Sequence, residues 1–267
     1  MAALAIGTMT CVVSSGADLS AEARAKAEAL AKSGQGGRGF GGGRRAPLVE
    51  RDRVPYDGRF MFARLRYGGT GGNGFRRDPP WSHDYPRSDW HFMRIVEEIT
   101  LTRSHRDESN VFALDDPELL NFPVAYMSEP GYWSMTDDEA EGLRGYFLKG
   151  GFVIFDDFRG RDWDNLEVQM RRVLPDHRFV QLDATSPVFH SFFEIKSLDF
   201  KAYYDSDPVF YGLFEDNDPA KRLLAIANYN NDLGEYWEFS DTGYVPVDLS
   251  NEAYKFGVNY LVYAMTH

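Results

Sequence analysis

The 267-residue sequence contains a single cysteine, Cys11, close to the amino terminus. A single cysteine excludes an intramolecular disulfide and a cysteine-rich zinc site. Its position also excludes a cysteine nucleophile from the rest of the chain after residue 11. The sequence also lacks the Gly-x-Ser-x-Gly elbow that presents a serine nucleophile in many hydrolases. Ordinary acyl transfer through a covalent intermediate is therefore not expected, which argues against an enzyme of that type.

Positive charge is scarce, with 29 Lys and Arg against 41 Asp and Glu and a net charge of -12. Residues 1–54 carry eight of the cations and five of the anions, so residues 55–267 carry 21 against 36. Phosphate backbones are bound by clustered Lys and Arg, so we expect no nucleic-acid partner. The Gly- and Arg-rich run at 33–45 has the composition of a flexible linker.

No hydrophobic run is long enough to predict a transmembrane span. Residues 2–16 are small and apolar and resemble the later part of a secretory signal, without its positive start. We expect an exported protein, periplasmic or peripheral to a membrane, with the cytoplasm as the alternative. Residues 1–54 are predicted to be a signal-like segment and flexible tail, through which peripheral membrane association would occur, and residues 55–267 a single α/β domain.

What the sequence does contain is an alternation of strand and helix patterns. Apolar runs predict strands at 59–67, 122–127 and 152–155, and further strands near 179–182, 209–214 and 222–229. Thr136 and Glu139 form a capping box that predicts a helix between the second and third of these strands, so those two strands should be parallel. Other helices are expected at 88–100, from Asp162, and from Ser250 to the end, whereas 101–121 is expected to be a connection with a short helix.

A glycine motif follows the first predicted strand. Gly69, Gly71 and Gly74 satisfy Gly-x-Gly-x-x-Gly, which binds dinucleotides when a helix begins at the last glycine. Pro79 and Pro80 follow and oppose such a helix. We therefore expect no nicotinamide or flavin, and no cofactor.

Polar residues follow several predicted strands, and ligands bind at the carboxyl ends of parallel strands. The candidate catalytic residues are Asp156, Asp157, His83 and His190. Aromatic rings beside carboxylates suit a sugar or a hydrolytic carboxylate pair, and the candidate ligand-binding residues are Trp81, Asp84, Tyr85, Asp89, Glu129, Tyr132, Asp232 and Trp237.

Each candidate also has a purely structural interpretation. Asp156 or Asp157 would cap a helix or pair with a nearby arginine, and Asp84 and Asp89 would close turns. His190 lies between phenylalanines and would be a hydrogen-bonded core residue. The candidate ligands are scattered along the chain without metal-site spacing, so no metal site is expected.

Several motifs together resemble one family. They are Trp81-x-His-Asp-Tyr-Pro-x-x-Asp, Gly150-Gly-Phe-x-x-x-Asp-Asp, the aromatic turn at 187–195, Asn-Asp-Leu-Gly at 231–234 and Gly-Val-Asn-Tyr at 257–260. The chain resembles the bacterial domain of unknown function 4159 family over about residues 58–266. The resemblance implies a three-layer sandwich with a mostly parallel central sheet, flavodoxin-like or similar to class I glutamine-amidotransferase domains, but it implies no established reaction.

Three functions remain open. The first is a non-catalytic binding module for a carbohydrate or a protein. The second is an accessory subunit of a larger complex, with residues 1–54 as its tether. The third is a hydrolase that uses Asp156 or Asp157 with His83 or His190.

Overall fold

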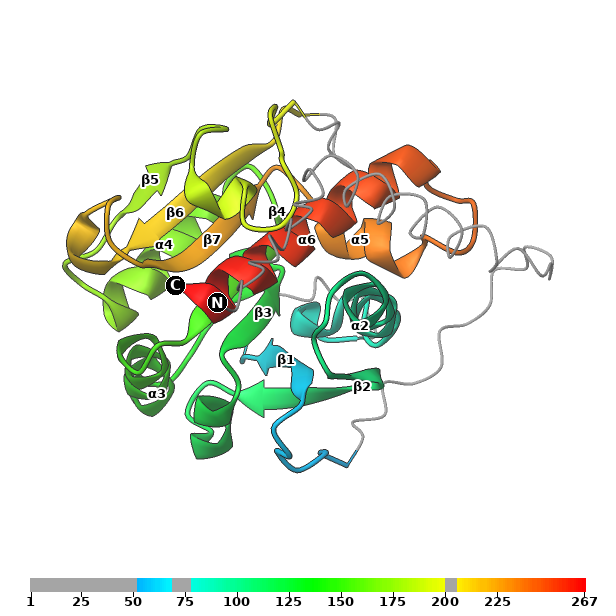
Figure 1. Ribbon diagram of the computed structural model, residues 1–267. Coiled ribbons are helices and arrows are strands. Elements are labelled where there is room, and N and C mark those ends of the chain that lie inside the picture. Colours follow the sequence, from blue (N-terminus) through cyan, green and yellow to red (C-terminus); the bar gives the residue numbers. More distant parts are fainter. Residues whose placement is uncertain (1–51, 69–77, 200–205) are drawn as a thin grey trace, which may run out of the picture.

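A central sheet organises the domain (Figure 1). The computed structural model describes residues 52–68, 78–199 and 206–267. Its seven strands lie in the order β2-β1-β3-β4-β7-β6-β5. They are β1 (Phe60–Arg66), β2 (Ser104–Ala113), β3 (Val124–Ser128), β4 (Phe152–Phe158), β5 (Phe179–Gln181), β6 (Val209–Phe214) and β7 (Leu223–Tyr229).

The sheet is mostly parallel, as the sequence predicts. Neighbouring strands from β2 through β1, β3 and β4 to β7 pair in parallel. Strand β6 runs antiparallel to both β7 and β5. The carboxyl ends of five consecutive strands therefore meet along one edge of the sheet.

Helices cover both faces of the sheet and complete a three-layer α/β sandwich (Figure 1). Buried residues form two clusters, one shared with α2, α5 and α6 and the other with α3 and α4. The helices are α2 (Arg87–Ile99), α3 (Asp137–Leu148), α4 (Asp162–Val173), α5 (Leu233–Glu238) and α6 (Val247–Thr266). Short 3-10 turns are η1 (Pro80–Ser82), η2 (Pro117–Asn121), η3 (Pro130–Tyr132), η4 (Pro187–Phe189) and η5 (Glu215–Asn217).

The predicted capping box begins α3. The Glu139 amide donates to Thr136 Oγ1 at 3.1 Å, and the Thr136 amide donates to the Glu139 carboxylate at 2.7 Å. After the helix, Gly150 adopts φ 106°, a conformation that other residues rarely adopt. These local signals explain why the β3–α3–β4 unit could be predicted from the sequence.

Three local predictions were wrong. The predicted connection at 101–121 contains β2, a ten-residue edge strand. Its centre is charged and half-exposed, as edge strands often are, so it lacks an apolar pattern. The helix α5 was not predicted, and α6 begins at Val247, so Ser250 lies inside it and does not cap it.

Other predictions fall outside the described residues, namely the tail before residue 52 and the glycine motif at 69–74. Among the residues that the structure does describe, no helix combines the length and the apolar character needed to cross a membrane.

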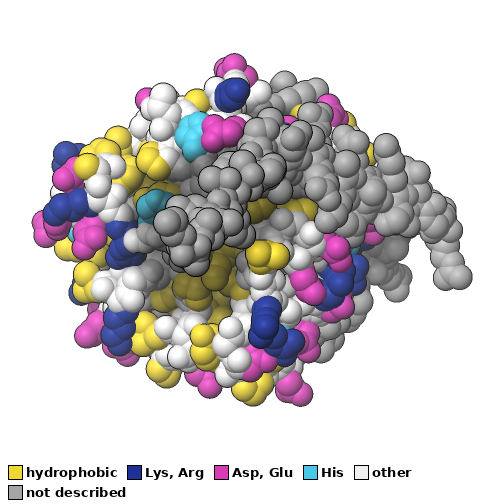
Figure 2. Space-filling model, viewed as in Figure 1, with side chains coloured by type: hydrophobic (Ala, Val, Ile, Leu, Met, Phe, Trp, Pro, Cys, Tyr) yellow, Lys and Arg dark blue, Asp and Glu magenta, His cyan; other side chains and the backbone are white. Residues whose placement is uncertain are grey.

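The surface that Figure 2 shows mixes Lys and Arg with Asp and Glu, and hydrophobic side chains are exposed between them. A hollow of about 590 Å³ is lined by Phe60 and Pro123, at the amino ends of β1 and β3. Another, of about 300 Å³, is lined by Leu223 at the amino end of β7. Both hollows lie at the edge of the sheet opposite the strand carboxyl ends.

Candidate functional site

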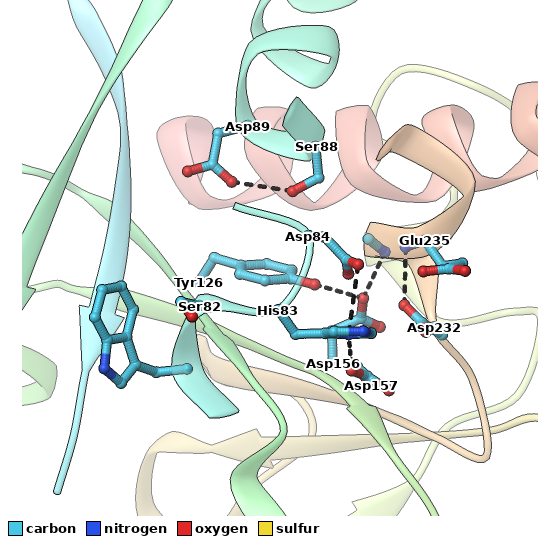
Figure 3. A network of polar contacts seen from close by, with 12 residues as sticks. Ser82, His83, Asp84, Ser88, Asp89, Tyr126, Asp156, Asp157, Asp232 and Glu235 are labelled. Carbon is cyan, nitrogen blue, oxygen red and sulfur yellow. Dashed lines mark hydrogen bonds and ion pairs between the residues drawn. The ribbon is translucent and has the colours of Figure 1, made fainter. Parts of the chain in front are cut away.

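Acidic side chains and one histidine meet at the carboxyl ends of the parallel strands (Figure 3). His83 and Asp84 follow β1 and η1, Glu129 directly follows β3, and Asp232 follows β7. Asp156 and Asp157 lie in the last residues of β4. The structure therefore brings together candidates from four separate segments of the chain.

His83 and Asp157 form the closest polar contact of this cluster. The Nδ1 atom of His83 lies 2.6 Å from Asp157 Oδ2 and 3.4 Å from Asp84 Oδ1 (Figure 3). The His83 side chain is 24% exposed, whereas those of Asp84 and Asp157 are 0% and 2% exposed. His83 is thus the member of this group that faces solvent, and the carboxylates lie behind it.

The charge of His83 follows from these contacts. Burial disfavours the imidazolium, but the hydrogen bond to Asp157 and the charges of Asp84 and Asp157 outweigh it and raise the pKa of His83 to about 10. With its carboxylate neighbours ionised, His83 is a cation at neutral pH.

Three of the cluster residues have a left-handed backbone. The φ angles are 63° for Asp84, 48° for Glu129 and 57° for Asp157. Non-glycine residues rarely adopt this conformation, although Asp adopts it more readily than most, and residues that do so cluster at functional sites. At Asp157 the left-handed turn interrupts the alternation of β4 and directs this carboxylate to His83.

Asp156 connects three elements in the interior. Its carboxylate accepts hydrogen bonds from the Tyr126 hydroxyl at 2.8 Å, the Gly234 amide at 2.9 Å and the Asn228 amide group at 3.0 Å. Tyr260 donates to Asn228 Oδ1 at 2.9 Å, which sets the orientation of that amide. Burial raises the pKa of Asp156 to about 7, although the hydrogen bonds from Tyr126 and Gly234 oppose this.

Asp84 is buried without such donors. Within the described part of the chain no hydrogen bond reaches either of its carboxylate oxygens. Burial, followed by the charge of Asp157, raises its pKa well above the usual value, and the charge of His83 opposes the rise. A buried carboxylate that lacks donors is costly, because its desolvation is not compensated.

Asp232 begins α5 and adds a further buried acid. It accepts a hydrogen bond from the Glu235 amide at 2.9 Å and so caps the helix. Burial and the charge of Asp157 raise the pKa of Asp232 well above its usual value. The Glu235 side chain is also buried on this first turn.

Two groups of side chains in this cluster have the spacing of metal ligands. One ligand atom from each of His83, Asp84, Asp232 and Glu235 lies within 4.8 Å of the others. The same holds for the smaller group of His83, Glu129 and Asp157.

A buried ion pair holds the segment that carries His83. Arg64 of β1 donates to Asp89 of α2 through Nη2 at 2.5 Å and through Nε at 3.2 Å. Its Nη1 donates to the carbonyl oxygens of Trp81 and His83 at 3.1 and 2.9 Å. Asp89, proposed from the sequence as a ligand-binding residue, therefore lies inside the protein and anchors the backbone behind the cluster.

The structure does not bring the aromatic candidates together at the surface. Trp81 is buried, and Trp237 is 0% exposed and stacks on Phe92 with ring centroids 4.5 Å apart. Tyr132 is 36% exposed and Tyr85 is half-buried. Neither tryptophan is available to stack on a ligand.

His190 lies apart from the cluster. It follows η4, where its Nδ1 contacts Glu194 at 2.9 Å and its Nε2 contacts the Ala184 carbonyl oxygen at 2.6 Å. Both ring nitrogens are therefore occupied by local partners.

Sequence reasoning missed Arg64, Tyr126 and Glu235. Arg64 stands between apolar residues in a predicted strand, and a buried arginine there signals a required partner. Glu235 directly follows the Asn-Asp-Leu-Gly motif, so its proximity to Asp232 could have been noticed. Nothing in the sequence around Tyr126 indicates its contact with Asp156.

The model of a family described as "Domain of unknown function (DUF4159)" matches residues 61–265. A search of curated proteins found no match.

Proposed function

Because the chain belongs to the DUF4159 family, whose description assigns no reaction, we propose a function from its own residues: a hydrolase that uses water as nucleophile and the His83 imidazolium, held by Asp157, as proton donor. The observation that carries this proposal is the 2.6 Å contact between His83 Nδ1 and Asp157 Oδ2. It lies at the carboxyl ends of the parallel strands, where α/β proteins bind ligands.

The two residues have different roles in this proposal. His83 is partly exposed and, as an imidazolium, donates a proton to the leaving group of the substrate, so it is the catalytic residue. Asp157 is buried and fixes the orientation and charge of the imidazole.

Water is the nucleophile that the residues support best. The only cysteine is Cys11, and no Gly-x-Ser-x-Gly elbow is present. The resemblance to class I glutamine-amidotransferase-like domains is therefore proposed for the scaffold alone, supported by the mostly parallel sheet.

A hydrolase accounts for the cluster better than a carbohydrate-binding module. Sugar binding of the kind expected from the sequence depends on exposed aromatic faces, and both tryptophans near the cluster are buried. A binding module also has no need for several buried carboxylates with raised pKa values around one histidine.

The test is a turnover assay on the full chain with p-nitrophenyl acetate, p-nitrophenyl phosphate and p-nitrophenyl glycosides. We expect hydrolysis of at least one class, reduced about 100-fold or more in His83→Ala and Asp157→Asn. His190→Ala is the matched control and should retain the wild-type rate. If all three variants hydrolyse equally well, the His83–Asp157 pair is not the catalytic centre. If none of the substrates turns over, a binding role is favoured instead.

The location of the protein is a separate proposal. We propose export, from the signal-like composition of residues 2–16, with residues 1–54 as a tether to a membrane-peripheral partner. Cell fractionation tests the first part. A pull-down that compares the full chain with a version starting at Pro55 tests the second, because a partner held by the tail is lost on truncation.

A further inference from the structure

Four side chains beside the His83–Asp157 pair have the composition of a cation site. They are His83 and Asp84 from the segment after β1, and Asp232 and Glu235 from the start of α5, with ligand atoms within 4.8 Å of one another. The three carboxylates are buried and the histidine is the solvent-facing member. Two segments far apart in the sequence thus converge on one small volume (Figure 3).

Asp84 distinguishes this group from an ordinary acidic cluster. Its side chain is 0% exposed, and neither oxygen accepts a hydrogen bond within the described residues. Nearly all buried carboxylates accept hydrogen bonds, whereas the cationic contact of Asp84 that the structure shows is His83 Nδ1 at 3.4 Å, too indirect to count as a hydrogen bond. A bound cation would supply the missing interaction.

Asp84 packs so closely against Gly234 that only a glycine fits at this position. A Cβ atom on Gly234 would lie 2.6 Å from Asp84 Oδ2 and 2.7 Å from the Tyr126 hydroxyl oxygen. Any larger residue at this position would displace the carboxylate. The Gly234 amide donates a hydrogen bond to Asp156, which fixes the Gly234 backbone. No hydrogen bond fixes the Asp84 carboxylate beside it within the described residues.

We propose that His83, Asp84, Asp232 and Glu235 bind one divalent transition-metal cation such as Mn²⁺ or Zn²⁺. Three carboxylates and one imidazole are ligands that these cations accept, whereas Mg²⁺ and Ca²⁺ prefer oxygen ligands alone. Four protein ligands complete a tetrahedral Zn²⁺ site, whereas a six-coordinate Mn²⁺ keeps open positions for water.

This inference deepens the proposed function and rests on it for its catalytic meaning. Because a metal-binding imidazole is neutral, the cation would displace the proton of His83; it would then hold the attacking water and make it more acidic, in place of proton donation by His83. Asp157 would then act as the carboxylate partner that orients a metal-binding histidine. Cation binding itself is measured without turnover, so the two proposals can fail separately.

The smaller group of His83, Glu129 and Asp157 shares the histidine and is the competing location. Substitution of Glu129 separates the two sites, because Glu129 belongs only to the smaller group. We expect Glu129→Gln to bind the cation as tightly as the wild type.

The experiment uses the tag-free full chain, stripped with EDTA and titrated with Mn²⁺, Zn²⁺, Mg²⁺ or Ca²⁺ by isothermal calorimetry. We expect one equivalent of Mn²⁺ or Zn²⁺ per chain, and at least tenfold weaker binding of Mg²⁺ and Ca²⁺. Asp84→Asn and Asp232→Asn should each weaken Mn²⁺ or Zn²⁺ binding at least tenfold. His190→Ala, which removes a histidine outside the cluster, is the matched control and should not change the affinity.

A melting experiment shows whether a variant has lost the site or only the fold. The cation should raise the melting temperature of the wild type and not that of Asp84→Asn. Without the cation, Asp84→Asn should melt no lower than the wild type, because it removes a buried carboxylate that lacks donors.

The inference is overturned if the stripped wild type takes up no stoichiometric Mn²⁺ or Zn²⁺, or if Asp84→Asn binds as tightly as the wild type. Stoichiometric binding without hydrolysis of any test substrate supports the cation site and contradicts the proposed function. Hydrolysis that persists at full rate in the EDTA-stripped protein supports the proposed function and contradicts a role of the cation in it.

Discussion

Replacing Asp89 by alanine is expected to cost more stability than replacing any exposed acidic residue. Arg64 and Asp89 are both 0% exposed, and the substitution leaves the Arg64 guanidinium buried without its counter-ion. Burial alone would lower the pKa of Arg64, but the charge and hydrogen bonds of Asp89 raise it above its usual value. Arg64 nevertheless stays charged in the interior when Asp89 is removed, because a guanidinium is effectively always protonated in proteins.

The expected cost is about 3–5 kcal/mol, which is the usual result of removing one partner of a buried ion pair. The bonds from Arg64 to the Trp81 and His83 carbonyl oxygens remain and hold the total toward the lower part of this range. For a domain of this size the loss corresponds to a decrease of roughly 6–20 °C in melting temperature.

Urea denaturation followed by circular dichroism measures the loss. The control is Asp107→Ala, which breaks an exposed ion pair with Arg94. The Arg94 side chain is 43% exposed and the Asp107 side chain is 58% exposed. This control should cost about 1 kcal/mol or less. The double variant Arg64→Met with Asp89→Leu should recover most of the stability, because it removes both buried charges.

The reasoning is refuted if Asp89→Ala is no more destabilising than Asp107→Ala. It is also refuted if the double variant is much less stable than Asp89→Ala, because the uncompensated charge would then not be the cause. A further consequence concerns the site, since Arg64 holds the backbone of His83. Asp89→Ala should therefore also weaken cation binding in the calorimetric assay.

Three further predictions follow from the interior of the domain. The free energy of unfolding, measured in EDTA, should fall by a few kcal/mol between pH 5 and pH 9. The reason is that four groups hold their protons more tightly in the folded state than in the unfolded state, namely Asp84, Asp156, Asp232 and His83. Urea midpoints that rise with pH would contradict this sign. Asp156→Asn should cost about 1–3 kcal/mol at pH 8, above the Asp156 pKa of about 7, because its amide donor would face only donors where the ionised carboxylate accepts three hydrogen bonds. A cost near zero would show that these hydrogen bonds are unimportant. Gly131→Ala should destabilise α4 by about 1–3 kcal/mol, because its Cβ would lie 2.4 Å from Asp162 Cβ; an unchanged melting curve would contradict the close approach.

The parts of the fold that could be predicted from the sequence are those with local signals. The buried run at 152–155, the capping box at Thr136 and the apolar strands at 124–128 and 223–229 each depend on residues a few positions apart. Strand β2 was missed because its charged centre has no apolar alternation, and its place at the sheet edge requires none.

The candidate site was predicted in outline for the same reason. Parallel strands place their carboxyl ends at one edge, so His83, Asp84, Asp157 and Asp232 could be grouped before their contacts were known. The same rule included Trp237, which the tertiary structure places in the core, and Asp89, which it pairs with Arg64. It could not show which side chains point toward one another.

The sequence by itself determined that residues 55–267 form an α/β domain without a thiol, and that acidic residues follow its central strands. Those properties follow from composition and short-range periodicity. Only the tertiary structure decided that Asp157 meets His83, that Asp156 is an interior anchor and that Asp84 is buried without a donor. The reason is physical: these contacts join segments that are separated by whole strands and helices, and they depend on left-handed turns and packing that no local pattern specifies.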